Sequence, residues 1–190
     1  MGPVDHETPV EVGTQLLEQL TWHWDHHLRP RLDGLTDDEY HWEPVEGCWG
    51  VRPRGTSSAP ITAGGGDWLV DFALPEPVPP PVTTIAWRLG HLVVGIFGER
   101  NHSHFDGPPI AYDDFAYAGA ADEALAQLDA GYAHWVQGVA ALGDRLWAPV
   151  GEAEGPFAPL PYAALVLHVS REVIHHGAEV RVLRDLYRSR

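Results

Sequence analysis

A glutamate and a histidine four residues apart, near the end of the chain, are the residues best placed to do chemistry. They are Glu172 and His176. On an α-helix, residues at this spacing project from one face, one turn apart. A carboxylate and an imidazole held in this way are a ready pair of metal ligands. His175, three residues after Glu172, is the less favourable partner.

A metal site needs a third ligand from another helix. His168 lies eight positions before His176, which is about 12 Å along a helix axis, so one ion cannot bind both. The candidates for the third ligand are His91, His23 and His27. A purely structural alternative also exists, in which Glu172 is neutralised by His176 or by an arginine of a neighbouring helix.

His23 and His27 are themselves four residues apart, and helical spacing puts His27 near the apolar side of its segment. They form a rival metal pair. The alternative for these two is an ordinary, partly exposed helix face, because such spacing is common in helices.

Composition limits the chemistry. The chain has 190 residues, 12 histidines and a single cysteine, Cys48, so any metal site must use nitrogen and oxygen ligands. The formal net charge of −15 disfavours nucleic acid and anionic membrane surfaces as partners. The apolar stretch from Ile85 to Gly98 contains Arg88 and His91 and is too short to cross a bilayer. With no secretory signal at its start, we expect a cytoplasmic protein with one domain over residues 1–190.

Apolar residues recur at helical spacing in four segments, which predict the elements that hold these side chains. The predicted helices cover about 10–32, 83–100, 122–146 and 162–187. They favour an all-α fold, a four-helix bundle. Glu172 and His176 fall inside the apolar stripe of the last helix. His91 falls outside the main stripe of the second, so periodicity leaves its direction open.

A long segment rich in proline and glycine, residues 43–81, joins the first two helices. It is either a packed binding loop or a poorly ordered connector. Its tryptophans favour packing, and only Trp68 to Phe72 looks like a strand.

Several strings resemble DinB-like proteins. They are Thr84 to Leu92, which contains Gly90-His91-Leu92, Leu167 to Glu179, and Leu35 to Arg52. The resemblance implies a four-helix bundle of the DinB/YfiT-like type with a divalent metal held by His91, Glu172 and His176. Glutamate as the first ligand of the last helix is similar to the mycothiol-dependent maleylpyruvate isomerase branch. Zinc is the expected metal, with nickel as the alternative.

The resemblance also implies a reaction in which a low-molecular-weight thiol attacks a small electrophile, and it makes a homodimer plausible. The alternatives are a metal-dependent hydrolase and a non-catalytic metal-binding stress-response or scaffold protein. Around the ligands, His168 and His175 are candidates for support or proton transfer, and Glu179 for orienting His175. Candidates for substrate contact are Trp49, Trp68 and Trp87.

Overall fold

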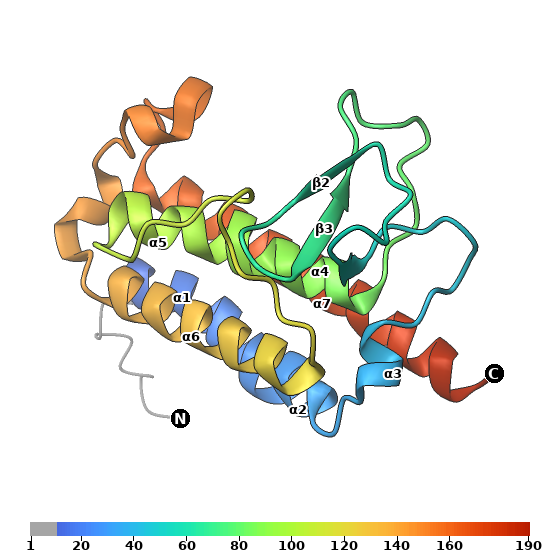
Figure 1. Ribbon diagram of the computed structural model, residues 1–190. Helices are drawn as coiled ribbons and strands as arrows, with labels where there is room; N and C mark the ends of the chain where they lie inside the picture. The colour runs from blue at the N-terminus through green and yellow to red at the C-terminus, as the bar shows by residue number, and fades with distance from the viewer. Residues whose placement is uncertain (1–10) are drawn as a thin grey trace, which may run out of the picture.

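The computed structural model describes residues 11–190, and four long helical segments dominate it (Figure 1). Two of them contain a π-helical stretch. The first segment consists of α1 (Val12–His23), η1 (Trp24–Leu28) and α2 (Arg29–Leu32), and the second of α4 (Ile85–His91), η2 (Leu92–Gly98) and α5 (Glu99–His104). The third and fourth are α6 (Ala121–Ala140) and α7 (Tyr162–Arg188). The prediction of a mainly helical chain is confirmed.

The four segments bury their apolar faces against one another. α7 contacts α1, α4 and η2, and α6 contacts α1, α4, η2 and α5. Fully buried side chains come from every segment, among them Leu20, Leu89, Leu128, Trp135 and Val173. These residues belong to the helical stripes seen in the sequence, so burial of apolar surface holds the segments together.

Helix ends follow local signals. The hydroxyl of Thr84 accepts a hydrogen bond of 3.2 Å from the backbone N–H of Trp87, which caps the start of α4. α6 ends at Ala140, earlier than predicted, and the 3₁₀ turn η3 (Gly143–Trp147) follows it. Gly143 has φ +51°, a left-handed conformation in which the α-helix cannot continue.

The prediction of an all-α fold is wrong for the segment between the first two long helices. After the short helix α3 (Asp37–Tyr40), this segment forms a three-stranded antiparallel sheet of β1 (Val51–Pro53), β2 (Ile61–Ala63) and β3 (Trp68–Phe72), with β3 in the centre. β1 and β2 have three residues each, too few for an alternating pattern to be visible in the sequence. β2 and β3 form a hairpin closed by residues 64–67, whereas β1 pairs with β3 across the intervening β2.

The sheet is anchored to the helix that carries His91. The Asp71 carboxylate, which is buried, accepts hydrogen bonds from the backbone N–H of Gly50 at 2.8 Å and from Nε of Arg52 at 2.9 Å. The indole N–H of Trp87 donates to the backbone carbonyl of Asp71 at 2.9 Å. Much of the 43–81 segment is therefore packed structure. Within residues 11–190, no helix is both long and apolar enough to cross a membrane.

Candidate functional site

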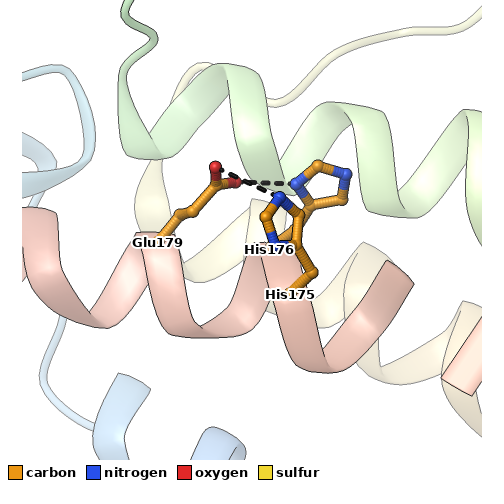
Figure 2. Close-up of side chains that lie close together, drawn as sticks. All are labelled: His175, His176 and Glu179. Carbon is orange, nitrogen blue, oxygen red and sulfur yellow. Dashed lines mark hydrogen bonds and ion pairs between the residues drawn. The ribbon is translucent and has the colours of Figure 1, made fainter. Parts of the chain in front are cut away.

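His176, on the inner face of α7, is held by a carboxylate. Its Nδ1 lies 2.7 Å from Oε2 of Glu179 (Figure 2). An ionised carboxylate only accepts hydrogen bonds, so Nδ1 carries the ring proton and Nε2 carries the lone pair. Nε2 lies 3.5 Å from Oε2 of Glu172. The free nitrogen of His176 and the carboxylate of Glu172 therefore face the same space.

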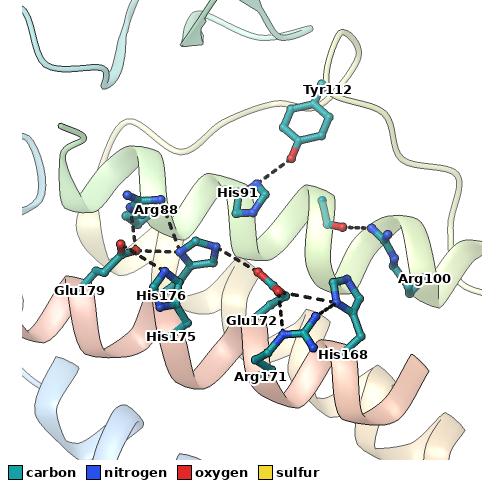
Figure 3. A network of polar contacts seen from close by, with 11 residues as sticks. Arg88, His91, Arg100, Tyr112, His168, Arg171, Glu172, His175, His176 and Glu179 are labelled. Carbon is teal, nitrogen blue, oxygen red and sulfur yellow. Dashed lines mark hydrogen bonds and ion pairs between the residues drawn. The ribbon is translucent and has the colours of Figure 1, made fainter. Parts of the chain in front are cut away.

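Arg88 of α4 compensates the charge of Glu179. Its Nε lies 3.0 Å from Oε2 of Glu179, and its Nη1 lies 3.4 Å from Nδ1 of His176. The guanidinium thus fixes the carboxylate that in turn fixes the imidazole, across the interface between α4 and α7 (Figure 3).

His91, from the end of α4, meets His176 in the space between the two helices (Figure 3). The two rings are perpendicular, with centroids 4.9 Å apart. Nδ1 of His91 lies 2.9 Å from the hydroxyl oxygen of Tyr112, and the indole of Trp87 stacks on the His91 ring with centroids 5.4 Å apart. A hydroxyl accepts as well as donates, so Nδ1–H can bond to Tyr112 and leave the lone pair of His91 on Nε2.

Gly95 makes the contact between Tyr112 and His91 possible. A Cβ atom at this position would lie 2.1 Å from the Tyr112 hydroxyl oxygen and 3.2 Å from Nδ1 of His91. The first distance is far below any real contact, so no larger residue fits while Tyr112 stays in place.

Burial keeps both imidazoles neutral. Burial, together with the nearby His176 and Arg88, lowers the pKa of His91 to about 4. Burial also lowers the pKa of His176, although the hydrogen bond to Glu179 acts in the opposite direction. Burial raises the pKa of Tyr112, which keeps its phenol proton. Neutral imidazole is the form that binds a metal.

Glu172 lies at the rim of this site. Its side chain is 23% exposed, although its helical stripe predicted a core position. Its Oε1 is 3.6 Å from Nδ1 of His168 and 3.4 Å from Nε of Arg171 (Figure 3). These cationic or polar neighbours and partial solvent access explain how α7 carries a carboxylate at this position without a large desolvation cost.

A second group of donor atoms shares His176 with the set of His91, Glu172 and His176. One donor atom from each of His175, His176 and Glu179 lies within 4.8 Å of the others. The His175 side chain is 63% exposed, and its Nε2 is 3.5 Å from Oε1 of Glu179, farther than His176 is. Glu179 therefore orients His176 more closely than His175, the partner expected from the sequence. A cation here would stand beside the guanidinium of Arg88, which disfavours it.

The rival pair, His23 and His27, does not gather further ligands. Their rings stack with centroids 5.8 Å apart, and His27 is exposed instead of facing the apolar side. The π-helical turn Trp24–Leu28 accounts for this, because it shifts the direction of the residues within it relative to an α-helical wheel. In the part of the chain that the structure describes, no third histidine, cysteine or acidic residue completes a compact group with them.

The three tryptophans proposed for substrate contact are not gathered in one place. Trp87 packs on His91. Trp49 is buried, and the centroid of its ring lies 6.0 Å from that of Trp87. Trp68 stacks instead on His41, with centroids 4.8 Å apart. Trp49 and Trp87 therefore support the site from within the core.

A family model described as the DinB superfamily matches residues 19–180. The chain belongs to the DinB superfamily. Comparison with curated proteins and with solved structures gives no significant match. The part matched by the DinB superfamily model contains every side chain of the site described above.

The residues present are of the kind that holds a divalent ion, the cofactor that DinB resemblance implies, although within residues 11–190 the compact group of donor atoms is His175, His176 and Glu179 and not His91, Glu172 and His176. Two neutral imidazoles, His91 and His176, each have Nδ1 engaged by a neighbour, and the Glu172 carboxylate stands beside the Nε2 of His176. Proteins usually orient a metal-binding histidine by a hydrogen bond to the ring nitrogen that does not bind the metal. Nitrogen and carboxylate oxygen donors suit zinc and nickel.

Three residues that contact the candidate ligands were not predicted from the sequence: Arg88, Gly95 and Tyr112. Helical spacing placed Arg88 and Gly95 in the same sector as His91, and a glycine inside a helix next to a candidate ligand was an available signal. Tyr112 lies in the irregular connection between α5 and α6, for which periodicity gives no direction.

Proposed function

We propose that this chain is a divalent-metal-dependent enzyme that uses a low-molecular-weight thiol on a small electrophile, as an S-transferase or a thiol-dependent isomerase. His91, Glu172 and His176 hold the ion, and the helical segments form a four-helix bundle of the DinB/YfiT-like type. The observation that carries the proposal is the 2.7 Å contact between Glu179 and Nδ1 of His176, which leaves Nε2 free beside Glu172.

Each residue of the site has a defined part in this proposal. Glu179 holds the proton of His176 on Nδ1, and Arg88 holds Glu179. Tyr112 fixes the ring of His91, and Trp87 covers one face of that ring and excludes water from it. Glu172, at the rim, is the ligand that a substrate approaches first.

Three protein ligands are typical of a catalytic rather than a structural metal, because they leave positions for a substrate. A divalent ion held there supplies Lewis acidity, which favours the ionised form of a thiol that binds to it. The two reacting molecules then meet over the rim at Glu172, the exposed edge of the site.

The first experiment asks whether the site takes a metal. We expect elemental analysis of the purified protein to find about one divalent ion per chain. After chelation, excess zinc or nickel at about 100 times Kd should add about 2.7 kcal/mol of stability. That corresponds to an increase in Tm of about 5–10 °C for a chain of this size. No ion and no thermal shift would contradict the proposal.

The second experiment asks whether the metal-loaded protein is a thiol-using enzyme. A panel of electrophiles is incubated with several thiols, and consumption of free thiol is followed. We expect metal-dependent consumption that His176→Ala abolishes. Turnover of ester or amide substrates without thiol would instead indicate a hydrolase. Metal binding without turnover of any electrophile would favour the non-catalytic alternative.

A further inference from the structure

A hollow of about 460 Å³ lies beside the candidate site, between the first turns of α7 and residues 150–160. We call it the α7 hollow; His168 and Arg171 line one side, and Phe157 and Leu160 line another. Its volume is in the range of small-molecule sites, about 300–1,000 Å³. Because His168 and Arg171 also contact Glu172, the hollow adjoins the rim at which a substrate would enter.

The wall of the α7 hollow is unusually apolar for an exposed surface. Phe157, Leu160 and Leu167 are 61%, 46% and 53% exposed, and all three line it. Large apolar side chains that gather around one concave surface and stay in contact with water are typical of a binding site. An apolar group placed here would remove that surface from water.

Buried polar contacts hold this wall in place. Oε1 of Glu154, in η4 (Glu152–Phe157), accepts a hydrogen bond of 3.0 Å from Nε2 of His104 and lies 3.5 Å from Nε of Arg100. The His104 side chain is 2% exposed, and its Nδ1 lies 3.3 Å from the Tyr162 hydroxyl. Glu154 is therefore paired, so its charge does not dominate the hollow.

The polar side of the α7 hollow offers donors. Nη2 of Arg171 donates to Nδ1 of His168 at 2.7 Å, so the proton of the neutral His168 ring is on Nε2. Arg171 is 68% exposed, and most of its five N–H groups face solvent. A planar guanidinium matches the two oxygens of a carboxylate. In a chain of net charge −15, this exposed cation beside an apolar wall favours one kind of ligand.

We propose that the α7 hollow binds small amphipathic carboxylates. The apolar part of the ligand packs on Phe157, Leu160 and Leu167, and its carboxylate accepts hydrogen bonds from Arg171 and from Nε2–H of His168. Such a carboxylate is the substrate class of the neighbouring site; this assignment rests on the proposed function, whereas binding itself does not.

The test measures binding to the full chain after removal of metal with a chelator. The probes are 4-phenylbutyrate and its uncharged amide, titrated by calorimetry and by amide NMR shifts. We expect saturable binding of the acid, with shifts confined to residues 150–172 and the neighbourhood of Arg100, which also lines the hollow. Affinity for the amide should be lower by about tenfold, the typical contribution of a charge-assisted hydrogen bond.

Two matched variants separate charge from structure. Arg171→Gln should weaken binding of the acid about tenfold and leave the amide unchanged. Arg181→Gln, an exposed position on the same helix outside the hollow, should change neither. Phe157→Ala should weaken both probes.

Equal affinity for acid and amide, no saturable binding, or equal effects of Arg171→Gln and Arg181→Gln would overturn the proposal. Failure of the proposed function is a separate result, because it is measured by metal content and thiol consumption. If the protein binds the acid but no metal, the result supports carboxylate binding in the α7 hollow and contradicts the proposed metal-dependent enzyme.

Discussion

The hydroxyl oxygen of Tyr112 lies 2.9 Å from Nδ1 of His91, so a residue of an irregular connection fixes a side chain of a buried helix. The equivalent nitrogen of His176 is fixed by Glu179. Both imidazoles are therefore oriented in the same way, by a contact to Nδ1, and the contacting residues come from different elements. If an ion is bound by the opposite ring nitrogens, its affinity depends on these two contacts as well as on the ligands.

Tyr112→Phe removes only the hydroxyl group. We expect zinc affinity to fall by about tenfold, the lower end of the effect of losing a partner of a ligating histidine. The fold should persist, because the ring still packs edge-on against Phe72, with centroids 5.7 Å apart. Competition with a chromophoric chelator measures the affinity, and unchanged affinity would show that Tyr112 does not orient His91.

Gly95→Ala should have a similar or larger effect by a different route. The added methyl group would stand 2.1 Å from the Tyr112 hydroxyl oxygen, so the tyrosine must move away from His91. The matched control is Gly13→Ala, where a Cβ would meet Leu146 at an ordinary 3.6 Å. Zinc affinity should fall by about tenfold in the first variant and stay unchanged in the control. A decrease in both would indicate a general loss of packing.

Glu179→Gln separates the two overlapping groups of donors. If Glu179 only orients His176, zinc affinity should fall by about 10- to 100-fold, but one ion should still bind. His175→Ala should then have little effect, because His175 is 63% exposed, lies 3.5 Å from Glu179 and meets the His176 ring only edge-on, with centroids 5.0 Å apart. Loss of stoichiometric binding in both variants would instead assign the ion to His175, His176 and Glu179.

Glu39→Gln tests an ion pair that joins α3 to α7. Oε2 of Glu39 lies 3.2 Å from Nε of Arg184, and both side chains are 4% exposed. Removing one charge leaves the other buried, so we expect a loss of about 3 kcal/mol at pH 7 in urea unfolding. Arg188→Gln is the control; Arg188 contacts the same carboxylate but is 55% exposed, and its loss should cost below about 1 kcal/mol.

The effect of Glu39→Gln should depend on pH. Burial raises the pKa of Glu39, but hydrogen bonds from Arg184, the backbone N–H of Thr36 and Arg188 together hold it below its ordinary value. A carboxylate with a lowered pKa stabilises the fold at pH values above its unfolded pKa, and this contribution is lost as pH falls through the folded value. The difference between wild type and variant should therefore narrow below about pH 4. A constant difference from pH 7 to pH 3 would contradict this explanation.

The sequence predicted the helices well because their signals are local. Thr84 caps α4, and α7 runs from Tyr162 to Arg188, close to the predicted 162–187. The sheet was missed because β1 and β2 have only three residues each, too few to show an alternating pattern, and because β1 pairs with β3 across the intervening β2. The direction of His27 was mispredicted because a π-helical turn breaks the regular angular step.

The candidate site could be predicted only in part. The spacing of Glu172 and His176 is a property of one helix, so it was readable in the sequence. The position of His91 opposite His176 depends on how two helices pack, and spacing alone left it open. The supports from Tyr112 and Arg88 depend on contacts between distant segments, which only the structure supplies.

The most direct test of the site is a zinc titration of chelator-treated protein by calorimetry, comparing wild type with His91→Ala and with His175→Ala. His91 comes from α4 and His175 from the exposed side of α7, so the two variants differ in which group of donors they disrupt. We expect one equivalent of zinc in wild type and in His175→Ala, and binding weaker by at least about 100-fold in His91→Ala. Undiminished binding in His91→Ala would contradict the site formed by His91, Glu172 and His176.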